Sequence, residues 1–257
     1  MRSALVVAFT LAASTALAAP AKEAPKGYLP AGALDTTIIV PPAPVAGTTR
    51  YEADRTIFLS TRSLKDSPRW ALALKDDNYA GLMGAFACAV GFTPDEKSTP
   101  ALVKIMHRLE PDMDAAVRAA KTLYQRQRPF MIDEGEICLA KSDALRKSPD
   151  YPSGHATLGW TASLILAEAA PERASQILQR GRSFGESRIV CGVHNASAIE
   201  AARITGSALV ARLHGEAQFR KDMDAARAEV AKARATAPTP APAACAAEAE
   251  LIAKPPF

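Results

Sequence analysis

The sequence predicts an all-α protein with a single domain, and three observations support this. Alternation of polar and apolar residues, which marks half-buried strands, is absent, and so are Asn-Gly turn pairs. Helix-start signals such as Ser67-Pro68 and Thr99-Pro100 stand before segments rich in Ala and Leu. The chain has 257 residues, 48% of them hydrophobic, and shows no internal repeat, so it can bury one sizeable core.

The helical domain is expected to cover residues 51–235. It follows a segment (19–50) whose six prolines predict an extended N-terminal run, and it precedes a Pro/Ala-rich tail (236–257) that is expected to be flexible. Pro129 ends one helix, because a proline disfavours helical backbone in the residue before it. The expected helices are 51–64, 68–90, 100–109, 112–127, 142–146, 153–170, 171–181, 195–213 and 218–235, with 184–192 a short helix or loop.

Residues 1–18 have the pattern of a cleaved signal peptide: a positive start, an apolar run and a small-residue ending at Ala16-Leu17-Ala18. A membrane anchor is the alternative, but the apolar run is far shorter than the ~20 residues of a spanning helix. The protein is therefore expected in the periplasm or outside the cell. No later segment predicts a membrane helix, so no membrane partner is expected. The net charge of +4 is spread along the chain and does not indicate nucleic-acid binding.

Four cysteines in an exported chain favour disulfides over free buried thiols, and they allow three pairings. Cys138 and Cys191 each lie near a segment that carries chemistry, so we favour that pair. Cys88 with Cys245 then follows as the second pair. No Cys or His pair has the spacing of zinc ligands, so no metal site is predicted.

Lys121 and Arg128 form the first candidate segment of a functional site. They are seven residues apart, which is two helical turns, so their side chains share a face and can reach two oxygens of a tetrahedral anion. The alternative is a solvated basic helix end that complements the helix dipole. Arg126 points elsewhere on the helix and fits this second interpretation.

The second segment is Tyr151-Pro152-Ser153-Gly154-His155, at the start of an apolar helix. Unpaired backbone N–H groups at a helix N-terminus favour an anion, and Gly154 allows close approach of the backbone. The hydroxyl of Ser153 either donates to such an anion or caps the helix.

The third segment contains Ser187-Arg188 and His194. The guanidinium of Arg188 offers a planar set of donors suited to phosphate. His194 opens an Ala-rich helix and can act as a nucleophile, although a lone histidine there is more often a surface or capping residue. His107 and His214 are interpreted as surface residues without a role.

Together, Lys121-x6-Arg128-Pro129, Pro152-Ser153-Gly154-His155 and Ser187-Arg188-x5-His194 form a three-part pattern. It resembles the signature shared by bacterial class A non-specific acid phosphatases, membrane lipid-phosphate phosphatases and vanadium haloperoxidases. The likeness is greatest to the class A enzymes and covers about residues 51–220. It implies a helical bundle of the acid phosphatase and haloperoxidase type. Cys138 and Cys191 fall where that family has a cysteine pair, and a homodimer is a further expectation from the family.

The resemblance implies a phosphomonoesterase that needs no metal or other cofactor. It assigns nucleophilic attack on phosphorus to His194 and protonation of the leaving alcohol to His155. A neutral nucleophile with a protonated acid predicts a mildly acidic optimum. The substrates expected are small phosphomonoesters, with inorganic phosphate as product. The groups expected to hold the phosphoryl oxygens are Lys121, Arg128, Arg188, the Ser153 hydroxyl and the Gly154 amide.

One position departs from the family's pattern. The family has an aspartate four residues after the nucleophilic histidine, where it orients the imidazole, and this chain has Ala198. Loss of such a carboxylate in a serine-protease triad lowers the rate roughly 10⁴-fold. Ser197 is a weaker acceptor, and Glu200 lies about 120° away on a regular helix. Reduced activity is therefore predicted unless another residue orients His194, and Ala198→Asp is expected to raise turnover if the missing acceptor limits it.

Two alternatives to an exported acid phosphatase remain. A non-catalytic phosphate- or vanadate-binding relative is motivated by Ala198, and a helical structural protein with chance motifs is the other. A lipid-phosphate substrate is disfavoured because the helices that would embed such an enzyme are absent, and a haloperoxidase is disfavoured because the chain is short.

Overall fold

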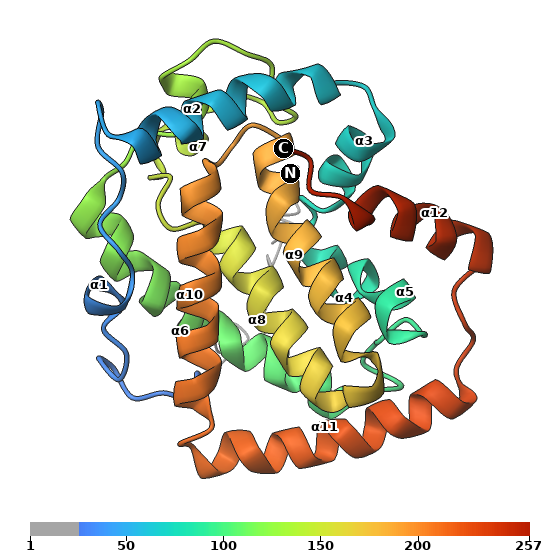
Figure 1. Ribbon diagram of the computed structural model, residues 1–257. Coiled ribbons are helices and arrows are strands. Elements are labelled where there is room, and N and C mark those ends of the chain that lie inside the picture. Colours follow the sequence, from blue (N-terminus) through green and yellow to red (C-terminus); the bar gives the residue numbers. More distant parts are fainter. Residues whose placement is uncertain (1–25) are drawn as a thin grey trace, which may run out of the picture.

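The structure is a computed structural model that describes residues 26–257. The predicted signal peptide, residues 1–18, lies outside the described residues. The described part is helical and contains no strand, so the all-α prediction is confirmed (Figure 1). None of the helices in this part is long and apolar enough to span a membrane. The helices are α1 (Thr36–Ile39), α2 (Thr49–Thr61), α3 (Pro68–Lys75), α4 (Leu82–Ala85), α5 (Ala87–Val90), α6 (Pro100–Tyr124), α7 (Asp143–Lys147), α8 (Gly154–Ala169), α9 (Ala174–Val190), α10 (Ala196–Leu213), α11 (Ala217–Thr236) and α12 (Pro242–Ala253).

Helix α8 is the centre of the fold. Most of its residues are buried and it is apolar on nearly every side, which is the pattern of a helix enclosed by neighbours. It packs between α9 and α10, while α11 crosses one end of this group and α2 the other (Figure 1). The start of α8, the end of α9 and the start of α10 therefore meet at one end of the bundle.

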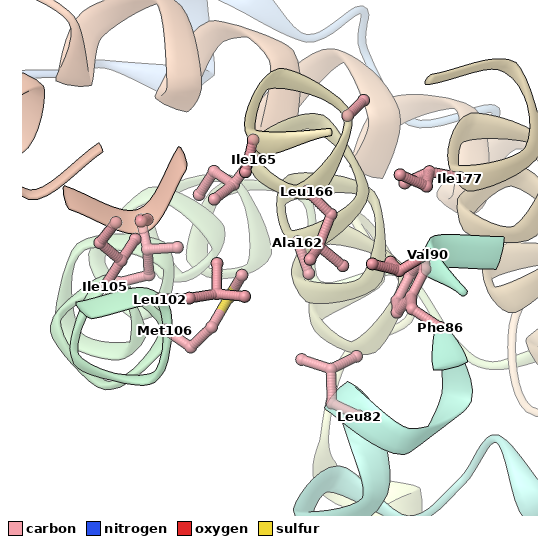
Figure 2. Close-up of a cluster of buried hydrophobic side chains, with 14 of the residues drawn as sticks. Leu82, Phe86, Val90, Leu102, Ile105, Met106, Ala162, Ile165, Leu166 and Ile177 are labelled. Carbon is pink, nitrogen blue, oxygen red and sulfur yellow. The ribbon is translucent and has the colours of Figure 1, made fainter. Parts of the chain in front are cut away.

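The main core joins α8 to α6 and to the short helices α4 and α5. Leu102 and Ile105 of α6 face Ile165 and Leu166 of α8, and Phe86 lies on the other side of α8 (Figure 2). Each fully buried side chain of this size stabilises the fold by about 1.5–3 kcal/mol relative to exposure. This core holds α6 and α8 in a fixed relation, and both helices contribute to the site below.

The boundaries of α6 and α9 differ from the sequence prediction. Helices expected at 100–109 and 112–127 are one helix, α6, with Pro111 inside it. A buried stripe that includes Leu102, Leu109 and Met113 continues past Pro111, and its burial offsets the lost backbone hydrogen bond. Segments 171–181 and 184–192 likewise fall mostly in α9. Gly181 does not end this helix. Its hydrogen lets α9 approach α8, since a Cβ there would lie 2.4 Å from Ser163 Cβ.

The helix expected at 68–90 is broken after Lys75. The chain turns inward at Asp76, whose buried carboxylate forms an ion pair with Arg180 of α9. Asp and Asn side chains favour such turns over continued helix, and Asp76-Asp77-Asn78 is a run of them. The chain then resumes as α4 and α5.

The C-terminal tail, expected to be flexible, contains the helix α12. Pro242 suits the first helical turn, and the following Ala-rich sequence has high helix propensity. The disulfide Cys88–Cys245 ties α12 to α5, and Arg182 of α9 donates to the backbone oxygen of Ile252. The second disulfide is Cys138–Cys191, so the cysteines pair as predicted.

Candidate active site

A cavity of about 460 Å³ opens where α6, α8 and α9 converge, and it brings together most of the predicted site residues. α6 contributes Lys121, while Arg128 comes from the loop that follows it. The start of α8 contributes Gly154 and His155, the last turn of α9 contributes Arg188, and His194 lies in the turn before α10. Residues 73 positions apart in the sequence, from 121 to 194, thus line one space.

Ser153 does not line this cavity. It is fully buried, and its Oγ accepts a hydrogen bond from the backbone N–H of Ala156 at 3.2 Å. The structure thus shows the helix cap, which was one of the two interpretations of this serine. Donation by Ser153 to a bound phosphoryl group stays a prediction.

Among the described residues, four cationic side chains line the cavity. Arg118 lies 4.0 Å from Asp114, while Lys121, Arg128 and Arg188 contact carbonyl oxygens or the carboxylate of Asp77. Lys121 Nζ donates to Pro149 O, and Arg128 donates to Ser148 O (2.8 Å) and Val193 O (2.7 Å). Burial lowers the pKa of Lys121 to about 8 and that of Arg128 to about 10, and the positive charges also depress one another. An anion in the cavity would relieve both effects, because it supplies the missing opposite charge.

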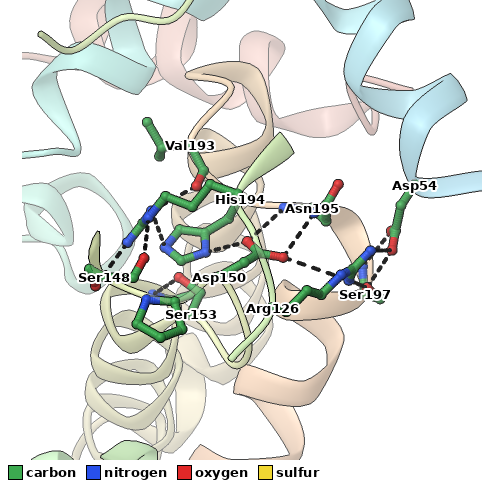
Figure 3. A network of polar contacts seen from close by, with 12 residues as sticks. Asp54, Arg126, Ser148, Asp150, Ser153, Val193, His194, Asn195 and Ser197 are labelled. Carbon is green, nitrogen blue, oxygen red and sulfur yellow. Dashed lines mark hydrogen bonds and ion pairs between the residues drawn. The ribbon is translucent and has the colours of Figure 1, made fainter. Parts of the chain in front are cut away.

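His194 lies at the back of the cavity between a carboxylate and a guanidinium. Its Nδ1 is 2.9 Å from Asp150 Oδ1, and its Nε2 is 3.2 Å from Arg128 Nη1 (Figure 3). Ionised Asp150 can only accept, so Nδ1 carries the proton and Nε2 keeps its lone pair. Burial and the nearby cations lower the pKa of His194 well below its ordinary value. The imidazole is therefore neutral, as a nucleophile requires.

Asp150 is a site residue that the sequence analysis missed, and its setting also corrects the interpretation of Arg126. Arg126 is buried, not solvated, and its guanidinium lies between Asp150 (3.6 Å) and Asp54 (2.8 Å). Burial raises the pKa of Asp150, while Arg126 and the Asn195 N–H groups oppose that shift. The sequence left open which residue orients His194 in place of position 198, and in the structure the Asp150 carboxylate, from the loop before α8, contacts its Nδ1. A lone aspartate in a loop gave no signal of this role.

His155 is the second histidine of the cavity. Its Nε2 lies 2.6 Å from the backbone oxygen of Asp76, which can only accept, so Nε2 carries a proton. Its Nδ1 is buried and has no hydrogen-bond partner. The ring stacks on Phe184 and meets the edge of Tyr79. The free Nδ1 is therefore the atom through which His155 can exchange a proton with a substrate.

Asp76 supports this arrangement from behind the cavity. Its carboxylate pairs with Arg180 and accepts a hydrogen bond from Ser187 Oγ at 2.6 Å, while Arg69 donates to the same hydroxyl at 2.9 Å. The Asp76 carbonyl that holds His155 is thus fixed to α9. The sequence analysis missed this residue too, since its partners are more than 100 positions away.

The remaining histidines lie elsewhere. His107 is exposed on α6, and His214 Nε2 lies 2.9 Å from Glu168 Oε2, away from the cavity. Among residues 26–257, no group of three or more His, Cys, Asp or Glu side chains has an arrangement that could hold a metal ion.

Comparison with known proteins identifies the family to which this site belongs. An acid phosphatase of Zymomonas mobilis is 43% identical over 202 residues, which are 77% of this chain and 76% of that protein. A non-specific acid phosphatase of Providencia stuartii is 38% identical over 204 residues (78% and 82%), and one of Salmonella typhimurium is 32% identical over 208 (79% and 83%). The family model described as PAP2 superfamily matches residues 113–220.

The chain belongs to the PAP2 superfamily. The matched range contains all three segments that carry the resemblance, from Lys121 to His194, so that prediction is confirmed. Within this family member, position 198 is alanine and Asp150 contacts His194.

The pKa of His155 has a consequence for stability. Burial, and then the charges of Arg188 and His194, lower it to about 3, so the folded protein keeps this ring neutral above that pH. The unfolded chain binds the proton below about pH 6.5, so stability falls as the pH drops from about 6.5 towards 3, by about 1.4 kcal/mol per unit for this group.

We expect thermal unfolding to show this as a difference between wild type and His155→Gln. Between pH 7 and pH 4 the midpoint of the wild type should fall more steeply than that of the variant, because glutamine takes up no proton. Saturating inorganic phosphate should reduce the wild-type decline. Parallel pH profiles for the two proteins would contradict the neutral, buried state of His155.

Asp77 lines the cavity and forms an ion pair with Arg188. Its Oδ1 is 2.6 Å from Arg188 Nη1, and its side chain is about one-third exposed. A phosphoryl group that uses Arg188 must share this cation or displace the carboxylate, and both carry negative charge. Asp77 therefore opposes anion binding in the ligand-free state.

Asp77→Asn is expected to tighten binding of inorganic phosphate by about three- to tenfold, because it removes about 1 kcal/mol of competing charge interaction at a partly exposed site. Isothermal titration of wild type and variant checks this. Asp133→Asn, which breaks the Arg55 ion pair outside the cavity, serves as the control. Weaker phosphate binding in Asp77→Asn would show that the carboxylate assists the anion instead.

Proposed function

We propose that this protein is an exported acid phosphatase that hydrolyses small phosphomonoesters through a phosphohistidine on His194. The observation that carries the proposal is the neutral imidazole whose unprotonated Nε2 faces the cavity that Lys121, Arg128 and Arg188 line. Phosphoryl transfer to an enzyme requires a nucleophile next to positive charges that bind the phosphoryl oxygens, and this cavity contains both. The names of the relatives agree with this chemistry.

In the first step, the phosphoryl group of the substrate lies among Lys121, Arg128 and Arg188, and the Gly154 amide donates to an oxygen. His194 Nε2 attacks phosphorus, the P–O bond to the alcohol breaks, and His155 Nδ1 gives the alcohol its proton. The cations hold the charge that spreads over the equatorial oxygens in the transition state. Arg128 must exchange its contact with Nε2 for one with the phosphoryl oxygens before the attack, because the same lone pair of Nε2 faces Arg128 Nη1 and forms the bond to phosphorus.

His155 must gain a proton before this step, although the empty cavity keeps it neutral. Burial is the largest cause of the low pKa of His155 and the charge of Arg188 is the second. The negative charge of a bound phosphoryl group opposes both, because it offsets Arg188 and stabilises the protonated ring. Monoesters also carry a proton of their own below about pH 6, the region of their second pKa. Both effects favour a mildly acidic optimum. In the second step, neutral His155 accepts a proton from the water that cleaves the P–N bond.

The mouth of the cavity favours small substrates. Tyr79, Met113 and Leu145 line it with apolar surface, and Asp77 and Asp114 place negative charge beside it. We propose no metal, because Lys121, Arg128 and Arg188 supply the positive charge that a cation would otherwise provide. Export is supported by the two disulfides, which form in oxidising compartments.

The alternative, a non-catalytic phosphate- or vanadate-binding relative, was motivated by Ala198 alone. The contact between Asp150 and His194 removes that motivation, because the imidazole has its carboxylate from another segment.

Purified protein incubated with p-nitrophenyl phosphate between pH 5 and 7 tests the proposal. Hydrolysis is expected, with and without EDTA. Phosphate binding without hydrolysis above the uncatalysed rate would favour the binding protein, and loss of activity in EDTA would contradict the metal-free reaction. Fractionation of expressing cells tests export, which predicts the enzyme outside the cytoplasm.

A further inference from the structure

We propose that Asp150 is the positioning residue for His194. Position 198 is alanine and offers the imidazole no carboxylate, so the loop before α8 supplies one in its place. This inference rests on the proposed function, since it concerns how the nucleophile is held. Four contacts, a second layer of charges and the surroundings of Ala198 support it.

The contacts of Asp150 fix one tautomer of His194. Oδ1 accepts from His194 Nδ1 (2.9 Å) and from the backbone N–H of Asn195 (3.2 Å). Oδ2 accepts from Asn195 Nδ2 (2.9 Å) and lies 3.6 Å from Arg126 Nη1. The other three groups around this carboxylate are N–H donors, which favour its ionised form, and an ionised carboxylate can only accept. The imidazole therefore donates through Nδ1. The lone pair is then on Nε2, inside the cavity.

A second layer holds Asp150 in place. Arg126 bridges it to Asp54 of α2, and Asp54 accepts hydrogen bonds from Ser197 N (2.9 Å) and Ser197 Oγ in the first turn of α10. Figure 3 shows this chain of contacts running from Asp54 through Arg126 and Asp150 to His194. The carboxylate is thus anchored from the helix that follows the nucleophile and from α2, so it cannot swing away from the ring.

Position 198 is closed to a second carboxylate. Ala198 is fully buried beside Val40, Ala120 and Tyr151, and its carbonyl accepts from Ser153 N at 3.1 Å. An aspartate there would compete with Asp150 for the single Nδ1–H of His194 and would lie among apolar side chains. Ala198→Asp in the otherwise unchanged protein should therefore lower turnover, which is the outcome expected when another residue already orients His194.

Asp150→Asn is the variant that separates positioning from support of the loop. An amide has one accepting and one donating end. The accepting end is expected to face Arg126 and Asn195 Nδ2, because the guanidinium carries a full charge, and the backbone N–H of Asn195 then loses its acceptor. The NH₂ group then faces His194 Nδ1 and forces the proton to Nε2. We expect kcat to fall by about 10²–10⁴-fold, as when a triad aspartate becomes asparagine, with inorganic phosphate affinity within about threefold of wild type.

Asp112→Asn provides the matched control. Asp112 is also buried and accepts backbone N–H groups, from Tyr28 and Leu29, but lies away from His194. It should alter thermal stability and leave kcat unchanged. The double variant Asp150→Ala/Ala198→Asp removes the competition at position 198 and should recover at least tenfold of the activity that Asp150→Ala loses.

Nitrogen-15 NMR of histidine-labelled protein reads the tautomer directly and does not depend on hydrolysis. The proton of His194 should be on Nδ1 in wild type and on Nε2 in Asp150→Asn. An unchanged tautomer, or a kcat within about threefold of wild type, would overturn the proposal. If wild type hydrolyses no phosphomonoester but the tautomer of His194 still differs between wild type and Asp150→Asn, the proposed function fails while the positioning role stands.

Discussion

Replacement of His194 with alanine should lower turnover of p-nitrophenyl phosphate by at least about 10⁵-fold, because the nucleophile that forms the covalent intermediate is removed. The cations Lys121, Arg128 and Arg188 remain, so inorganic phosphate should still bind. The Asp150 carboxylate keeps Asn195 and Arg126 as partners in the variant, so the protein should remain folded. Steady-state kinetics and phosphate titration on the same preparation check both halves.

His107→Ala is the matched control, since His107 is exposed on α6 and outside the cavity. Its kcat should equal that of wild type. Residual activity of His194→Ala above about one part in 10³ would point to direct attack by water and would contradict a nucleophilic role for His194.

Replacement of His155 with glutamine should produce an effect that depends on the leaving group. An alkoxide needs a proton as the P–O bond breaks, so kcat for alkyl phosphates should fall by about 10²–10⁴-fold, the usual contribution of a general acid. p-Nitrophenolate leaves readily without a proton, so the rate constant of phosphoryl transfer from p-nitrophenyl phosphate to His194 should fall much less. Burst kinetics separate that step from hydrolysis of the intermediate, where His155 acts as base.

His214→Gln tests whether any loss is specific to His155, because His214 contacts Glu168 far from the site. It should change neither substrate's kcat. Equal losses for alkyl and p-nitrophenyl phosphate in the transfer step of His155→Gln would mean that the ring positions the substrate and transfers no proton.

The fold class could be predicted from the sequence because helix signals are local. The cavity residues were predicted from the three-part pattern and its family resemblance, Cys138–Cys191 from its nearness to two of those segments, and Cys88–Cys245 by elimination. Lys121 and Arg128 share a helix face by spacing alone, and the Pro152–His155 turn opens α8 as its residues suggest. These segments lie close together because the helices that carry them pack around α8. The uniformly apolar sequence of α8 predicts this central position. Six of the seven predicted catalytic and phosphate-binding residues line one cavity for these reasons.

Long-range partners of polar residues could not be predicted. Asp150, Arg126 and Asp76 act through residues 24 to 111 positions away, and nothing in their own neighbourhoods marks them. Arg126 shows the difficulty most clearly: its place near a helix end suggested solvent, whereas two buried carboxylates neutralise it. Ala198 left open which residue orients His194, because Asp150 lies 44 positions before the histidine and outside its helix.

The most direct test of phosphoryl transfer to His194 is rapid quenching of its reaction with a ³²P-labelled monoester. The reaction is stopped after milliseconds with alkali, because acid hydrolyses the P–N bond of a phosphohistidine. We predict label on protein that resists alkali, is released by mild acid and maps to the peptide containing His194. The label should be absent from His194→Ala. Phosphate released with no labelled protein at any quench time, or label on another residue, would contradict the account.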